Sequence, residues 1–258
     1  MASEWAQRYM ITARNLGILD GSRLPAEPSA VVFRDGAPRW YIAQLLGNFM
    51  VVYSDAADID EVVATWTLAN PCTCDADASC TICDTPVFPD IPATHPQHDV
   101  IVALATMGVL QGFPVAGGGY EFRPLGVLQR DHAAAGLTRM MAALGHTTTG
   151  FPAVDGTDRP TVEVVNGVYT ITTPYAERGF AEWGLPFISP YIPRISSATA
   201  PSIAFMYYHG IMGNMSGAAN IYRHGYRYEF RPFEGFTTQM LITGMVRMMA
   251  HDDWTLGA

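Results

Sequence analysis

Four cysteines lie close together in one short stretch, and their spacing would allow them to bind a metal ion or to form disulfide bonds. Cys72, Cys74, Cys80 and Cys83 are the only cysteines in the chain. Thiols at this density predict either a structural zinc site or two nested disulfides, because both stabilise a loop that has no core of its own. A reducing cytoplasm favours zinc, whereas an envelope-facing or virion protein favours disulfides. No thioredoxin-like βαβ pattern surrounds Cys80 and Cys83, which argues against a redox-active pair.

The other residues that do chemistry in proteins form no catalytic pattern here. The seven histidines are dispersed, and the chain lacks the HExxH, GxSxG, GxGxxG and Walker signatures. Asp131 and His132 are adjacent at the start of an expected helix, where the helix dipole favours a carboxylate. We therefore expect a protein without enzyme activity.

The charge balance excludes some classes of partner. All fifteen basic residues are arginine, and twenty-four acidic residues give a net charge of −9. Binding to nucleic acid needs clustered positive charge, so we expect no such partner. No apolar stretch reaches about 18 residues, so no membrane insertion is expected. The N-terminus lacks the pattern of a signal peptide, which favours a chain made in the cytoplasm or one trimmed of a leader.

The segment YEFRP occurs at 120–124 and again at 228–232, which indicates an internal repeat. Each copy follows a run with apolar residues at helical spacing that ends in a glycine, and a third such run lies at the N-terminus. These first helices are expected to begin near Trp5, Asp99 and Ser202. The aligned glycines are interpreted as backbone requirements, either left-handed caps or close helix approaches. They are Gly17, Gly108 and Gly210.

A second amphipathic helix is predicted in each repeat, over 39–50, 130–141 and 238–249. Apolar residues at spacing i, i+3 predict the buried face of these helices, and the methionines among them are interpreted as core filling. The aligned core positions are Leu46, Leu137 and Met245, followed by Phe49, Met140 and Met248.

Two insertions separate the repeats. The first opens with an acidic segment that is expected to form a short helix before the cysteines. In the second, Asn166-Gly167 stands between alternating β-branched residues and predicts a hairpin. The predicted boundaries are 1–52 for repeat one, 53–87 for the acidic and cysteine-rich insertion, 88–145 for repeat two, 146–186 for the hairpin insertion, and 187–258 for repeat three with its tail.

The middle repeat resembles a surface-layer homology (SLH) repeat. That family shows a Phe-x-Asp opening, a helix that ends in Gly-Ile-x-x-Gly, a Gly-Thr-Phe-x-Pro loop, and a Thr-Arg-Ala-Glu start to the second helix. The matching residues in this chain are Phe88 and Asp90, Gly108 and Gly112, Phe122 and Pro124, and Arg130.

This resemblance implies a mainly α fold, a pseudo-threefold prism of three helix-loop-helix repeats with inserted loops and a small β-hairpin. It also implies grooves between repeats that bind acidic secondary cell-wall polysaccharide, because an arginine at a helix N-terminus can hold a carboxylate bidentately. Repeat three has Thr238 where the arginine is expected, so binding is predicted only in the other grooves. The candidate glycan-binding residues are Arg39, Arg123, Arg130 and Asp131.

A structural role for these arginines is the competing interpretation, through bonds to loop carbonyls or salt bridges between repeats. Two functions follow. The first is a non-enzymatic structural or assembly protein, a phage virion or surface-lattice component with other structural subunits as partners. The alternative is a cell-envelope attachment module that binds acidic wall glycan. In either case the expected location is a virion or a bacterial cell surface, and structural zinc is the only cofactor expected.

Overall fold

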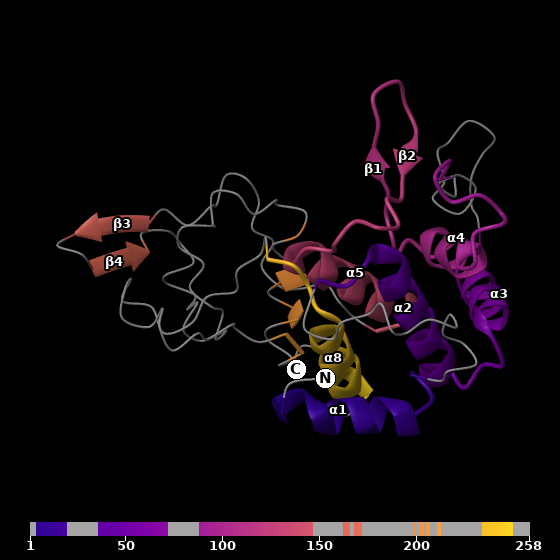
Figure 1. Cartoon of the computed structure of the whole chain (residues 1–258), viewed down its shortest axis with the longest axis horizontal. Coiled ribbons are helices and arrows are strands. Elements are labelled where there is room, and N and C mark those ends of the chain that lie inside the picture. The colour runs from indigo at the N-terminus through magenta and orange to yellow at the C-terminus, as the bar shows by residue number, and fades with distance from the viewer. Residues whose placement is uncertain are drawn as a thin grey trace.

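The computed structural model describes residues 4–19, 36–71, 88–146, 162–165, 168–171 and 234–249, with 199, 202, 203, 205, 206, 211 and 212. Within these residues the fold is mainly helical (Figure 1), and none of the helices is both long and apolar enough to cross a bilayer. The helices are α1 (Glu4–Asn15), α2 (Arg39–Tyr53), α3 (Ile59–Ala69), α4 (His98–Thr106), α5 (Arg130–Ala143) and α8 (Thr238–Met249).

The three helices expected to be the second of each predicted repeat begin where the sequence predicts. These are α2 at Arg39, α5 at Arg130 and α8 at Thr238, and they lie together in the body of the molecule (Figure 1). The six aligned apolar positions are all buried, so the methionines among them do fill the core. The residues are Leu46, Phe49, Leu137, Met140, Met245 and Met248.

The short segments that precede these three helices pair with one another, and we call this arrangement the bridge ring. Each segment contacts both of the others, and the middle residues Ala37, Leu128 and Phe236 are buried. The Phe236 N–H donates to the Leu128 carbonyl at 2.7 Å, and the Ala37 N–H donates to the Phe236 carbonyl at 3.1 Å. The antiparallel bridges of the ring are Gly36 with Thr237, Pro38 with Val127, and Gln129 with Gly235.

One side chain fills the space where the first residues of the three segments meet. A methyl group on Gly36 would collide with Cγ1 of Val127, and one on Gly235 would lie 3.1 Å from the same atom. Glycine at two of the positions therefore makes room for valine at the third.

Two of the helices expected to open the predicted repeats are described, and both pack on helices distant in the sequence. Helix α1 packs on α8, and α4 packs on α2 (Figure 1). The Thr138 hydroxyl of α5 likewise donates to the Ser202 carbonyl, at 3.5 Å. Helices α1 and α4 begin one residue before their expected starts. Gly17 and Gly108 have φ values of +83° and +71°, which confirms their interpretation as left-handed caps, while Gly210 lies outside the described residues.

The insertions agree with the sequence where they are described. Helix α3 confirms the expected acidic helix, and Asp58 caps it by accepting the Glu61 N–H at 3.0 Å. Strands β3 (Val162–Val165) and β4 (Val168–Ile171) pair antiparallel and confirm the predicted hairpin. The sequence did not predict a second hairpin, formed by β1 (Phe113–Pro114) and β2 (Tyr120–Glu121), which projects from the body in Figure 1.

Candidate functional site

A pocket of about 180 Å³ lies between α2, α5 and the loop that follows α4. Leucines such as Leu46 and Leu137 supply part of its apolar lining, and Arg39, Arg139 and His132 supply its basic groups. Among the lining residues that the structure describes, none is aspartate or glutamate, although the whole chain carries a net charge of −9. A small site with basic groups and no acidic group suits a negatively charged ligand.

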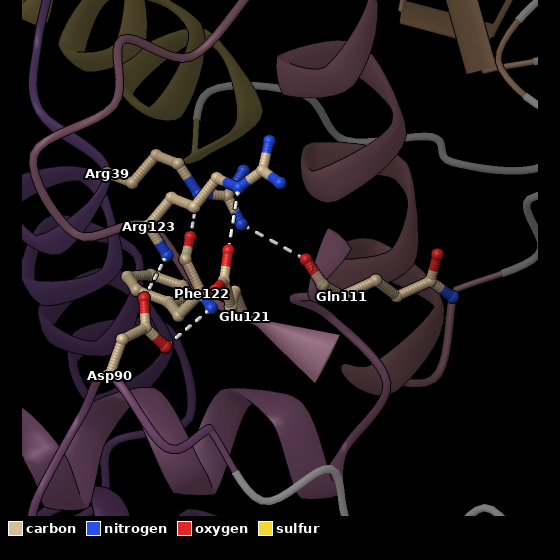
Figure 2. Close-up of polar contacts among 6 residues, drawn as sticks. All are labelled: Arg39, Asp90, Gln111, Glu121, Phe122 and Arg123. Atoms are coloured by element: carbon tan, nitrogen blue, oxygen red, sulfur yellow. Dashed lines mark hydrogen bonds and ion pairs between the residues drawn. The ribbon is translucent and has the colours of Figure 1, made fainter. Parts of the chain in front are cut away.

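Arg39, a predicted glycan-binding residue, lines this pocket but is already engaged (Figure 2). Its Nε donates to the Phe122 carbonyl at 2.7 Å, and its Nη2 donates to the Gln111 carbonyl at 3.0 Å. The guanidinium carbon lies 4.7 Å from the ring centroids of both Phe113 and Phe122. Burial lowers the pKa of Arg39 to about 10, while Asp90 acts in the opposite direction. Arg39 therefore joins α2 to the YEFRP loop and to the loop that follows α4.

Asp90 holds the YEFRP loop in place. Its carboxylate accepts the Phe122 N–H at 2.9 Å and the Arg123 N–H at 2.6 Å (Figure 2). Arg123 has φ of +59°, an unfavourable conformation for a residue other than glycine, and the Asp90 contact stabilises it. The Phe88 ring lies 5.6 Å from the Phe122 ring. The Phe-x-Asp opening and the YEFRP loop are thus one structural unit.

The side chain of Arg123 is half exposed and lies beside the pocket. It forms an ion pair with Glu121 at 3.3 Å (Figure 2), and its guanidinium carbon lies 4.7 Å from the ring centroid of Phe113, which lines the pocket. Through this contact Arg123 lies at the edge of the pocket and outside its lining.

Arg130 and Asp131 are buried and lie outside the lining of the pocket. Arg130 donates through Nη1 to the sulfur of Met240 at 3.3 Å. Asp131 accepts the backbone N–H of His132 at 2.8 Å. Burial raises the pKa of Asp131, and the charge of His132 acts in the opposite direction. Of the four predicted residues, the structure places Arg39 in the pocket and Arg123 at its edge.

Arg139 and His132 are the pocket residues that sequence reasoning missed as ligand contacts. His132, Gly136 and Arg139 follow the spacing i, i+4, i+7, which places them on one face of α5. This spacing, with a small residue between two basic ones, is a signal that the sequence contained.

The four predicted zinc ligands, Cys72, Cys74, Cys80 and Cys83, lie outside the described residues. Zinc or disulfide bonding therefore stays a prediction. In the parts of the chain that the structure does describe, no three side chains of histidine, cysteine, aspartate or glutamate are grouped as metal ligands.

The pocket offers basic groups and apolar surface to a ligand that has both a negative group and an uncharged body. Such a ligand would be small, because pockets for drug-sized molecules run to about 300–1,000 Å³ and this one holds about 180 Å³. No family model, curated protein or solved structure matches this chain.

Proposed function

We propose that the chain is a non-enzymatic module built as a pseudo-threefold prism of three SLH-like repeats. The bridge ring supports this proposal, because its three segments precede three aligned helices and pair in cyclic order. The packing of α1 on α8 and of α4 on α2 follows the same cyclic order. The left-handed caps at Gly17 and Gly108 add a third correspondence between repeats.

On this scaffold we propose attachment to an acidic cell-wall polysaccharide at a bacterial surface. The observation that carries the proposal is the basic pocket between α2, α5 and the loop that follows α4, which is lined by two arginines and a histidine and by no described acidic residue. An acidic chain repels polyanions in general, so a local site of this kind would make binding selective for an anionic group of the right shape.

Cosedimentation with purified cell wall tests this function. We expect the wild-type protein to sediment with walls that carry acidic polysaccharide, and to be released as salt screens the contact. Amidation of the wall carboxylates with carbodiimide should abolish sedimentation. Thr238→Ala is the matched control and should sediment like the wild type, because Thr238 is fully buried and replaces the arginine of the other repeats. Sedimentation that survives both salt and amidation would reject the proposal.

A second candidate function is assembly with other structural subunits of a virion or surface lattice. It is favoured by exposed apolar side chains in and beside the bridge ring and the YEFRP loop, since exposed apolar groups mark contact surfaces. Leu125 is 81% exposed, Val127 53% and Tyr120 47%. Light scattering after size-exclusion chromatography distinguishes the candidates. A protein that forms larger particles as its concentration rises and never sediments with wall is an assembly protein.

A further inference from the structure

We propose that Arg139 binds the carboxylate of the ligand and that Arg39 serves as a fixed clamp between repeats. The inference rests on the proposed attachment function and assigns the anion contact within that pocket. The arginine at the start of the second helix is the one that the SLH resemblance singles out. The geometry points instead to an arginine in the middle of α5, which belongs to none of the matched motifs.

Arg39 has little left to offer a ligand. A guanidinium holds a carboxylate best through two parallel N–H groups on one edge. The edge formed by Nε and Nη2 of Arg39 already donates to the carbonyls of Phe122 and Gln111, and aromatic rings lie near its carbon. The residue is only 6% exposed. Removing Arg39 from these contacts would open the junction between α2 and the YEFRP loop.

Arg139 differs from the residues at the same position in the other two helices. Counted from the helix starts, it aligns with Asn48 of α2 and Arg247 of α8. Asn48 donates to the Ile18 carbonyl at 3.1 Å, and Arg247 donates to the Ile211 carbonyl at 3.3 Å. Each acceptor directly follows an aligned glycine of its own repeat. In each of these two predicted repeats, the side chain therefore ties the second helix to the loop that follows the first helix.

The matching acceptor in repeat two is the Val109 carbonyl. A methyl group added to Gly136 would lie 3.9 Å from that oxygen, and one added to Gly244 would lie 3.9 Å from the Ile211 oxygen, so the loops approach α5 and α8 alike. Nevertheless Arg139 makes no hydrogen bond or ion pair with any residue in the described part of the chain, and it lines the pocket instead. Arg139 therefore lacks the loop contact that Asn48 and Arg247 make, and its guanidinium is available to a ligand.

Burial makes this arrangement unfavourable without a ligand. It lowers the pKa of Arg139 below the ordinary arginine value, and no described acidic group lines the pocket to compensate. A bound carboxylate would supply the missing negative charge and would match the planar guanidinium. The apolar part of the lining and the small volume suit one sugar acid of a polymer rather than a polyphosphate.

The test compares two variants that remove the same charge, Arg139→Gln and Arg14→Gln, in wall cosedimentation. Arg14 is exposed on α1 and serves as the control. We expect Arg139→Gln to lose at least about tenfold in affinity with an unchanged or higher melting temperature, and Arg14→Gln to stay within about twofold of the wild type. Arg39→Gln should lower the melting temperature, because it loses both carbonyl contacts. Equal sedimentation of Arg139→Gln and wild type would overturn the inference and leave attachment standing.

A small probe tests Arg139 without the wall. Sodium glucuronate is titrated into ¹⁵N-labelled wild-type protein, with glucose as the neutral control, and the Arg139 Nε–Hε resonance is assigned from its loss in Arg139→Gln. We expect glucuronate to shift this resonance and glucose to leave it unchanged. If the shift occurs but the protein never sediments with wall, the inference stands and the proposed attachment is wrong. If the resonance does not respond to glucuronate, the assignment of Arg139 is wrong.

Discussion

Replacing Asp90 by asparagine is expected to loosen the YEFRP loop and lower the stability of the whole fold. The Asp90 carboxylate accepts two backbone N–H groups, at 2.9 Å from Phe122 and 2.6 Å from Arg123. A hydrogen bond to a charged group contributes about 1.5–3 kcal/mol. Asparagine keeps one acceptor oxygen and turns an NH₂ group toward the second N–H. Its loss of charge also removes the favourable field at the buried Arg39.

We therefore expect the free energy of unfolding to fall by about 2–3 kcal/mol. For a chain of this size that corresponds to a drop in melting temperature of roughly 4–12 °C. Urea and thermal unfolding followed by circular dichroism measure both quantities. The matched control is Asp99→Asn, because the Asp99 side chain is 91% exposed and should change stability by less than about 0.5 kcal/mol. If the two variants unfold alike, Asp90 is not the residue that holds the loop.

Two further predictions concern the start of α5 and the bridge ring. Burial raises the pKa of Asp131 above 3.8, so the folded protein retains a proton that the unfolded chain releases, and stability is lost as pH rises through the folded pKa. Asp131→Asn should therefore raise the melting temperature at pH 7 and leave it unchanged below pH 3.8 in calorimetry, whereas an equal gain at both pH values would rule out this linkage. Gly36→Ala should cost about 1–3 kcal/mol in urea unfolding through overpacking against Val127, and adding Val127→Ala should restore most of it. Additive losses would show that the two residues do not meet.

The repeat alignment predicted where the helices begin, but it did not predict the structure of the loops. Apolar positions at helical spacing, together with the aligned Arg39, Arg130 and Thr238, placed the starts of α2, α5 and α8. The β1–β2 hairpin was not predicted, because each of its strands has two residues, which is too few for an alternating pattern to be recognised.

The candidate site was harder to predict, because the type of a residue did not reveal whether its side chain lines the pocket or holds the fold together. Arg139 and Arg247 are the same amino acid at positions that the predicted repeat alignment equates, yet Arg247 donates to a loop carbonyl and Arg139 lines a pocket. Likewise, the sequence was compatible with either a ligand-binding or a structural role for Arg39. Only the positions of Phe122 and Gln111 show that its N–H groups donate to their backbone carbonyls. These differences depend on side-chain direction, which a sequence pattern does not record.

The bridge ring also governs when this chain can fold during its synthesis. Gly36 pairs with Thr237, and α1 packs on α8. These N-terminal segments therefore cannot complete their native contacts until the C-terminal segments have been synthesised. Until α8 leaves the ribosome, the face of α1 that contains the buried Ala6 and Ala13 has no cover. Contacts between such distant segments slow folding and expose apolar surface in the meantime. A chain truncated before α8 would therefore keep α1, α2, α4 and α5 but would leave the buried face of α1 without the helix that covers it.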